Sequence, residues 1–100
     1  MNTEILEYIL SIEEEGSISK AAEKHMLTQP VLSRHLKKLE ARYDAQFFRR
    51  TPDGVVATGA GIVFLNSAQE VLHEEKLLNE KLAALKKKKE QEYNAKKPKG

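Results

Sequence analysis

A short segment in the middle of the chain repeats polar side chains at helical spacing. Gln29, Ser33 and Lys37 follow one another at steps of four residues, and Arg34 lies beside them. Residues at this spacing share one face of an α-helix. The face therefore presents an amide, a hydroxyl, an ammonium and a guanidinium group, and it carries no carboxylate until Glu40.

These side-chain types suit the base edges and phosphates of double-stranded DNA. A glutamine can bond adenine through two contacts and an arginine can grip N7 and O6 of guanine, whereas serine and lysine can reach backbone oxygens. A solvated face without a binding role more often mixes charges of both signs, and a face that binds a protein is expected to expose apolar anchors. The pattern predicts DNA as the partner.

The net charge of +2 hides a block pattern along the chain. Residues 1–15 carry five Glu and no Lys or Arg, whereas residues 20–50 carry eight Lys or Arg against three acidic residues. Residues 51–85 are acidic again, and residues 86–100 carry seven Lys against two Glu. A near-neutral chain with a basic middle block is typical of a one-sided electrostatic footprint, which suits a polyanion.

Short helices are expected to position the basic face. Apolar residues at three- and four-residue steps predict a first helix that ends at Gly16, and Ser17 is expected to cap a second, short helix over residues 18 to about 25. Thr28 caps a third helix with Pro30 in its first turn, where the missing amide proton is no loss. The expected buried stripe of the third helix is Leu32, Leu36, Leu39 and Tyr43.

A β-hairpin is expected to follow the third helix. Residues 46–50 favour a strand, and residues 52–54 are Pro-Asp-Gly, which predicts a turn. Residues 55–58 are expected to form the second strand of the hairpin. Arg49 and Arg50 stand at the base or flank of this hairpin, where they can touch phosphate or enter a minor groove. A helix-turn-helix over about residues 18–37 with such a hairpin beside it is a winged helix-turn-helix.

A long helix is predicted from residue 59 to about residue 89, and it carries a heptad seam. Such a seam indicates a homodimer, parallel or antiparallel, unless the stripe folds back on its own core. Ile62, Leu65 and Leu72 lie on a neighbouring face and are expected to pack against the first three helices. The expected dimer interface consists of Phe64, Ala68, Val71, Glu75, Leu78, Leu82 and Leu85.

The predicted fold is mainly α. A winged helix-turn-helix DNA-binding domain, made of three helices and a two-stranded β-hairpin wing at about residues 46–58, occupies residues 1–58. A linker and dimerisation helix occupies residues 59–89. Residues 90–100 form a basic tail that is expected to be disordered because it is a like-charge run with little apolar content.

Several classes of protein are excluded by composition. The chain has no cysteine, so it has no disulfide and no thiol chemistry, and its three histidines share no metal-ligand spacing. We therefore expect no enzyme activity, no metal and no cofactor. The longest apolar run, residues 62–65, is far shorter than the roughly 20 residues of a membrane helix. The amino terminus lacks the pattern of a signal peptide, so a cytoplasmic location is expected.

Three groups of residues carry a more specific pattern. They are residues 16–23, residues 28–34 with Leu36, Leu39 and Glu40, and the positions Phe48, Arg50, Thr58, Ala60 and Gly61. Together they closely resemble the amino-terminal winged helix-turn-helix of the LysR-type transcriptional regulators. The resemblance covers residues 1 to about 85 in order and without gaps. The chain departs from the family pattern at His25, Tyr43, Asp44 and Ala57, and these changes predict a lowered stability.

The resemblance implies a bacterial regulator, associated with the nucleoid, that binds an interrupted inverted repeat as a dimer paired through the linker helix. In the family, dimers often assemble into tetramers, and the chain continues into an effector-binding domain. This chain ends in lysines instead, as a piece of a longer protein or as a natural short form, and no small-molecule effector site is expected in it.

The resemblance also assigns roles to positions. It implies that Gln29, Pro30, Ser33 and Arg34 read or approach the major groove, that Thr28 lies near a phosphate, and that Arg50 anchors the wing. The full set of expected DNA-binding residues is Thr28, Gln29, Pro30, Ser33, Arg34, Lys37, Lys38, Arg50 and Thr51. The competing interpretation is a winged-helix module for protein interaction or dimerisation without specific DNA binding. The acid-free face without apolar anchors argues against it.

Overall fold

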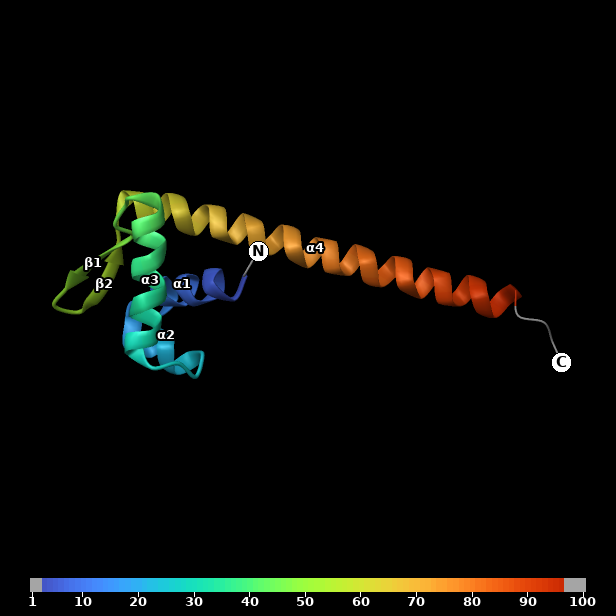
Figure 1. Ribbon diagram of the computed structural model, residues 1–100, viewed down its shortest axis with the longest axis horizontal. Helices are drawn as coiled ribbons and strands as arrows, with labels where there is room; N and C mark the ends of the chain where they lie inside the picture. The colour runs from blue at the N-terminus through green and yellow to red at the C-terminus, as the bar shows by residue number, and fades with distance from the viewer. Residues whose placement is uncertain (1–2, 97–100) are drawn as a thin grey trace.

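The computed structural model describes the backbone of residues 3–96 and the side chains of residues 3–89. The elements in chain order are α1 (Thr3–Glu15), α2 (Ile18–Lys24), α3 (Gln29–Tyr43), β1 (Phe48–Thr51), β2 (Gly54–Ala57) and α4 (Gly59–Lys96). The three short helices and the hairpin gather at one end of α4, which projects far beyond them (Figure 1). The molecule is accordingly 72 Å long and only 25 and 20 Å across. The predicted winged helix-turn-helix with a long terminal helix is confirmed.

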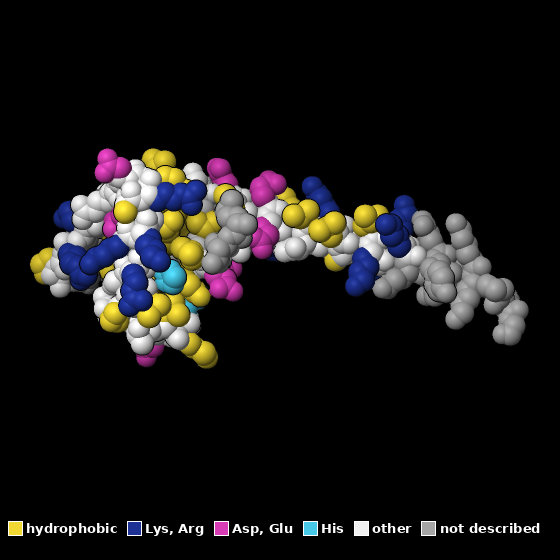
Figure 2. All heavy atoms as spheres, viewed as in Figure 1, with side chains coloured by type: hydrophobic (Ala, Val, Ile, Leu, Met, Phe, Trp, Pro, Cys, Tyr) yellow, Lys and Arg dark blue, Asp and Glu magenta, His cyan; other side chains and the backbone are white. Residues whose placement is uncertain are grey.

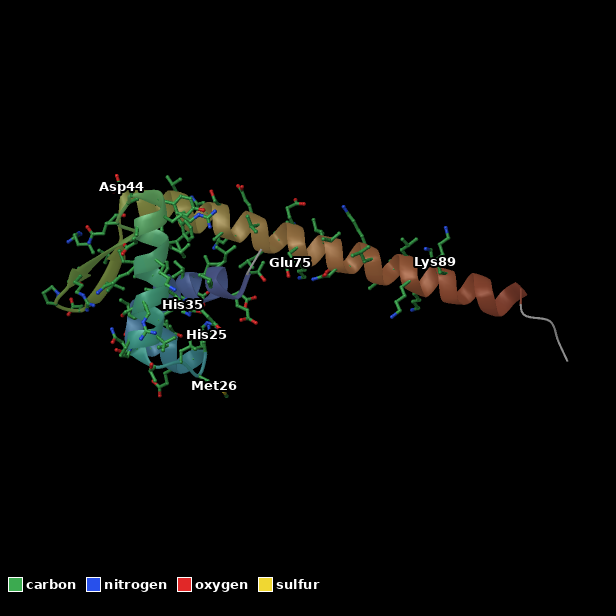
Figure 3. The ribbon with its side chains drawn as sticks, in the orientation of Figure 1. His25, Met26, His35, Asp44, Glu75 and Lys89 are labelled. Carbon is green, nitrogen blue, oxygen red and sulfur yellow. The ribbon has the colours of Figure 1, made fainter. Side chains whose placement is uncertain are left out.

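The boundaries of the short helices follow from residue types at their ends. Gly16 ends α1 with a φ of 63°, a left-handed conformation that glycine adopts without steric cost. The Ser17 side chain accepts a hydrogen bond from the Lys20 amide at 3.2 Å and begins α2. Met26 carries a positive φ of 58° in the turn between α2 and α3, and its side chain points into solvent (Figure 3).

The core lies where α1, α2 and α3 meet. Ile9, Ile12 and Leu32 are completely buried, and their stripe positions follow the helical period of the sequence. Ala21 and Ala22 are also buried, and their small side chains let α2 pack closely against its neighbours. This arrangement places α3 on the surface of the bundle with only one face buried.

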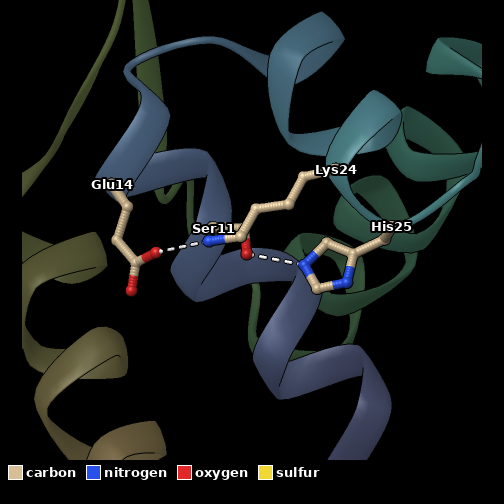
Figure 4. Close-up of polar contacts among 4 residues, drawn as sticks. All are labelled: Ser11, Glu14, Lys24 and His25. Carbon is tan, nitrogen blue, oxygen red and sulfur yellow. Dashed lines mark hydrogen bonds and ion pairs between the residues drawn. The ribbon is translucent and has the colours of Figure 1, made fainter.

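Two polar contacts join α1 to the end of α2 (Figure 4). Ser11, a buried polar residue, lies 2.6 Å from Nε2 of His25 through its Oγ. The Lys24 ammonium donates to the Glu14 carboxylate at 3.1 Å, but both side chains are exposed, so this ion pair contributes little stability. The Ser11–His25 contact gives the buried Ser11 hydroxyl a hydrogen-bond partner. The contact lies at the end of α2, where the turn toward α3 begins.

The hairpin is held against the turn between α1 and α2. β1 and β2 pair in antiparallel register, with Phe48 opposite Ala57 and Thr51 opposite Gly54. The Val55 amide donates to the Gly16 carbonyl oxygen at 3.0 Å. A Cβ atom on Gly54, whose φ is 141°, would overlap that same oxygen. The wing is therefore positioned by the first helix-helix turn as well as by its own ladder.

Phe47 joins the end of α3, the wing and the start of α4. Its amide donates to the Glu40 carboxylate at 2.6 Å, and its carbonyl oxygen accepts from the Thr58 amide at 2.9 Å. Its buried ring stacks on Phe64 with the centroids 4.5 Å apart. A Cβ on Gly61 would overlap the Phe47 carbonyl oxygen, so the first turn of α4 touches this backbone directly.

Two predicted core positions are wrong. Tyr43 was expected in the buried stripe of α3, but 54% of it is exposed because it is the last residue of the helix and lies at the rim of the core. Ile62 was expected against the short helices, but 53% of it is exposed. The contact at Gly61 turns the line of Gly61, Leu65 and Ala68 inward, which leaves Ile62 facing solvent.

The end of the long helix also differs from the prediction. α4 continues to Lys96, so residues 90–96 of the tail expected to be disordered are helical, and residues 97–100 lie outside the described residues. The segment before Pro98 contains no Gly or Pro and is rich in Lys, Glu, Gln and Ala, which favour helix. Among the described residues, no helix has the length and apolar character needed to cross a membrane.

The two glycines in the first turn of α4 give a matched test of the Phe47 junction. Gly61→Ala should lower the free energy of unfolding by about 1–3 kcal/mol, because a methyl group cannot fit against the Phe47 backbone. Gly59→Ala meets open space and should leave stability unchanged or raise it by up to about 1 kcal/mol. Urea unfolding followed by circular dichroism measures both, and equal effects of the two substitutions would contradict the close approach of α4.

Candidate nucleic-acid interface

The exposed face of α3 carries the predicted polar residues. Pro30, Arg34, Lys37 and Lys38 are exposed, whereas Gln29 and Ser33 are half-buried. The Gln29 amide donates from Nε2 to Oγ of Ser33 at 2.8 Å. This bond links residues one turn apart and holds the glutamine side chain along the face.

The cations of this face are not neutralised by acidic neighbours. Within the part of the chain that the structure describes, no carboxylate pairs with Arg34, Lys37 or Lys38. Glu40 follows on the same helix, but its carboxylate accepts the Phe47 amide and serves the junction with the wing. Lysine and arginine side chains gather over α3 and the wing (Figure 2). Such a surface attracts a polyanion.

A groove of about 370 Å³ separates α3 from the wing. Ser33 and Lys37 line it from α3, and Arg50 lines it from β1 above an apolar floor that includes Leu36 and Phe48. Two basic side chains and a hydroxyl from different elements therefore meet in one depression, which the Glu40 carboxylate also lines while it accepts the Phe47 amide. This is an arrangement suited to a phosphate group.

The alternation of side chains along β1 separates the residues expected on the wing. Arg50 lies on the same side of the strand as Phe48 and lines the groove, whereas Arg49 and Thr51 lie on the other side. The structure therefore brings Arg50 together with Ser33 and Lys37, and it does not bring Thr51 to them. Arg34 and Lys38, one turn apart, occupy the edge of α3 that does not line the groove.

Helix α3 begins where the sequence predicts, but the predicted N-cap residue makes no side-chain hydrogen bond to the helix. Thr28 is the N-cap residue, and Pro30 lies in the first turn. The Thr28 side chain makes no capping hydrogen bond. Its exposed hydroxyl stands at the positive end of a 15-residue helix, a position that favours an anion such as a phosphate.

Sequence reasoning missed Gln46 as a groove residue. Its side chain lines the groove, and its Nε2 donates to the Phe48 carbonyl oxygen at 3.0 Å. Gln46 belongs to neither a helix nor a strand, so no periodicity marks it. Only the return of the chain from α3 to β1 places it beside Lys37 and Arg50.

The predicted dimer seam divides into a covered and an uncovered part. Ala68 is buried within its own chain, and Phe64 is half-buried against Phe47. Val71 and Glu75 are half-buried. In contrast, about half of each following seam residue is exposed, namely Leu78, Leu82 and Leu85. The described part of the chain holds no cluster of three or more acidic, histidine or cysteine side chains that could bind a metal ion.

Comparisons with known proteins agree on one family. The sequence model described as bacterial regulatory helix-turn-helix protein, lysR family, matches residues 3–62. The HTH-type transcriptional regulator ClcR of Pseudomonas putida is 38% identical over 68 residues, which are 68% of this chain and 23% of that protein. An HTH-type transcriptional regulator of Methanocaldococcus jannaschii is 45% identical over 64 residues, which are 64% of this chain and 21% of that protein.

A solved structure agrees as well. The DNA-binding domain of CbnR in complex with DNA superposes with a TM-score of 0.79 at 27% sequence identity, over 85% of this chain and 98% of that one. The chain spans less than a quarter of the length of the two curated relatives described above.

Proposed function

Because the chain belongs to the LysR family of bacterial regulatory helix-turn-helix proteins, we propose that it binds specific sequences of double-stranded DNA as a homodimer on an inverted-repeat operator. The observation that carries the proposal is the exposed face of α3, which has no carboxylate before Glu40, beside the groove that Lys37 and Arg50 line. The similarity to a domain seen in complex with DNA supports it.

The side chains divide between reading bases and holding the backbone. α3 enters the major groove with Gln29 and Arg34 toward base edges, because amide and guanidinium groups form paired hydrogen bonds with adenine and guanine. Lys37 and Arg50 hold phosphates from the two sides of the groove. Thr28, Pro30, Ser33, Lys38 and Thr51 complete the proposed contact surface.

The uncovered part of the α4 seam supports the proposed dimer. Three leucines at heptad spacing in the second half of α4, Leu78, Leu82 and Leu85, are about half exposed among the described residues. A second copy of the same helix would bury them. Two copies would also give two equal recognition helices, which is why an operator with two-fold symmetry is expected.

Charge along α4 favours antiparallel pairing of the two helices. The first half of α4, residues 59–77, carries three Glu and one Lys, whereas the second half, residues 78–96, carries three Glu and six Lys. The lysines of the second half are seen toward the far end of the helix in Figure 2. A parallel pair would set Glu75 against Glu75 across the seam and Lys81 near Lys86 of the second copy. In an antiparallel pair, Glu75 faces Leu78 of the second copy and Glu74 lies near its Lys81, so opposite charges meet.

The proposed activity belongs in the cytoplasm, at the nucleoid. Assembly into tetramers and any response to a small-molecule effector are proposed for a longer protein context only, since the curated relatives are more than four times as long as the segment they share with this chain.

Selection of bound sequences from a random DNA pool tests the proposed function. The chain is incubated with the pool at moderate salt in the presence of nonspecific competitor. We expect a two-fold symmetric motif with half-sites about one helical turn apart. Binding that vanishes at modest salt and enriches no motif would leave only the general attraction of a basic surface, and it would favour the protein-interaction alternative.

Arg34→Ala should remove a base contact. We expect a loss of about 1–3 kcal/mol in binding free energy on the selected site, together with relaxed preference at one base position. Fluorescence anisotropy on the selected site and on variants of each base pair measures both quantities. A loss of equal size on every sequence would rule out a base-reading role for Arg34.

Arg50→Ala should weaken binding to all sequences alike and reduce the slope of log affinity against log salt, because one phosphate contact is lost. Arg49→Ala is the matched control. It removes the same charge, but Arg49 lies on the side of β1 away from the groove. If both substitutions change the salt slope equally, the groove has no particular part in phosphate binding.

The double substitution Leu78→Glu/Leu82→Glu should yield monomers, because four carboxylates would enter one seam. His73→Glu/Ala84→Glu adds the same number of charges at exposed positions outside the seam and should leave the dimer intact. Analytical ultracentrifugation distinguishes the two species. A seam variant that still sediments as a dimer would place the interface elsewhere.

A further inference from the structure

The tip of the wing carries a charge opposite to that of its first strand. Arg49 and Arg50 belong to β1, whereas the turn between β1 and β2 consists of Pro52 and Asp53, both exposed. The DNA contacts proposed above for the wing involve Arg50 and Thr51, and they leave Asp53 without a role. A carboxylate repels phosphate groups, so the partner that suits it on DNA is a hydrogen-bond donor.

Asp53 has no bonding task within the chain. An aspartate in a turn often bonds the backbone two residues further on, but the Asp53 carboxylate makes no hydrogen bond or ion pair with any residue that the structure describes. Other groups hold the backbone of the tip. Gly54 supplies the positive φ of 141°, and the Val55 amide donates to the Gly16 carbonyl oxygen at 3.0 Å. The carboxylate is therefore presented to solvent at a place that backbone contacts fix.

The hairpin continues past the point where it is proposed to hold a phosphate. With α3 in the major groove, Lys37 and Arg50 hold phosphates of the strand that borders this groove. The hairpin projects away from α4 beyond that point (Figure 1). At about 3.3 Å per residue, Asp53 lies up to about 10 Å past Arg50. This distance takes the tip across one sugar-phosphate backbone, and the surface beyond it is the minor groove, about 6 Å wide.

The minor groove offers a carboxylate one kind of partner. A·T and T·A pairs present only acceptors there, N3 of adenine and O2 of thymine, whereas a G·C pair adds the 2-amino group of guanine, which is a donor. An ionised carboxylate accepts hydrogen bonds and donates none. It therefore matches a G·C pair. It is repelled by the acceptors of A·T pairs and by the more negative potential of a narrow A·T minor groove.

We propose that Asp53 determines a base-pair preference of the wing, by accepting a hydrogen bond from the 2-amino group of a guanine in the minor groove beside each half-site. The inference rests on the DNA binding proposed above. It adds to the operator a G·C pair that α3 does not reach, and it assigns the readout of that pair to the turn of the wing. Arg50 holds the backbone, and Asp53 selects the pair beyond it.

Replacement of guanine by inosine tests this contact on the DNA itself. Inosine keeps N7 and O6 in the major groove but lacks the 2-amino group, so α3 meets an unchanged edge. Each G·C pair that adjoins the half-sites of the selected site is replaced in turn, and fluorescence anisotropy gives the dissociation constant. We expect binding to weaken about fivefold at one position beside each half-site. Where that pair is A·T, 2,6-diaminopurine in place of adenine adds the 2-amino group and should restore the affinity.

Variants of the tip identify the residue that responds to inosine. Asp53→Ala removes the acceptor, so the inosine effect should fall below about twofold. Asp53→Asn keeps an acceptor and gains a donor, so it should bind G·C and A·T pairs about equally. Circular dichroism checks the fold of each variant.

Asp44→Asn is the matched control, because it removes the same charge at the end of α3, away from the tip of the wing (Figure 3). Asparagine tolerates the left-handed φ of 48° at this position. This variant should keep the full inosine effect. If it loses the effect as Asp53→Ala does, the response reflects net charge and the inference is overturned.

The outcomes separate this inference from the proposed function. A parent chain that selects a two-fold symmetric motif but is insensitive to inosine at every adjoining pair overturns the inference alone. Because that series uses the parent chain, it is decisive even if a variant fails to fold. Equal strengthening of binding to all sequences by Asp53→Ala and Asp53→Asn would show that the carboxylate only repels phosphates, which also overturns the inference. A parent chain that enriches no motif overturns both.

Discussion

The contact between the Phe47 backbone and the first turn of α4 is the constraint on which the other features depend. The amide of Phe47 is held by Glu40 of α3, its carbonyl oxygen by Thr58, and Gly61 approaches so closely that no side chain fits. One residue thus joins α3, the wing and α4 by direct contacts. The Phe47 ring also stacks on Phe64 and buries apolar surface at the same point. The contacts that orient α4 therefore also stabilise the fold.

This junction leaves two surfaces of opposite character. The side of α3 that faces the wing is polar, since Lys37, Arg50 and Glu40 line the groove there. The Glu40 carboxylate accepts the Phe47 amide, and no ion pair joins Lys37 or Arg50 to a carboxylate among the described residues. The end of α3 next to α4 is aromatic and apolar, with Tyr43 at its rim. A single 15-residue helix therefore contributes to two surfaces of different character, one along its flank and one at its end. Packing only one face of α3 into the core makes both surfaces available.

Much of this fold could be predicted from local patterns. The spacing of apolar residues located three of the four helices, and Ser17 located the short helix α2. Gly16 and Pro30 marked helix ends, and the Pro-Asp-Gly turn located the hairpin. The two errors about buried positions share a cause. Tyr43 and Ile62 continue an apolar stripe in sequence, but burial depends on where a neighbouring element ends, and neither is covered within the chain. Residues 90–96 are helical in spite of their charge because Lys, Glu, Gln and Ala have a high helix propensity.

The sequence by itself determined the order of elements, the acid-free face of α3 and the heptad line of α4, because each follows from a repeat of three or four residues within one helix. Only the tertiary structure decided that Arg50 rather than Arg49 lines the groove with Lys37, that Gln46 joins them, and that Tyr43 opens onto an apolar groove. These relations depend on how helices and strands cross. Such crossings are fixed by contacts between residues far apart in the chain, such as Gly16 with Val55 and Phe47 with Gly61, which no local period reveals.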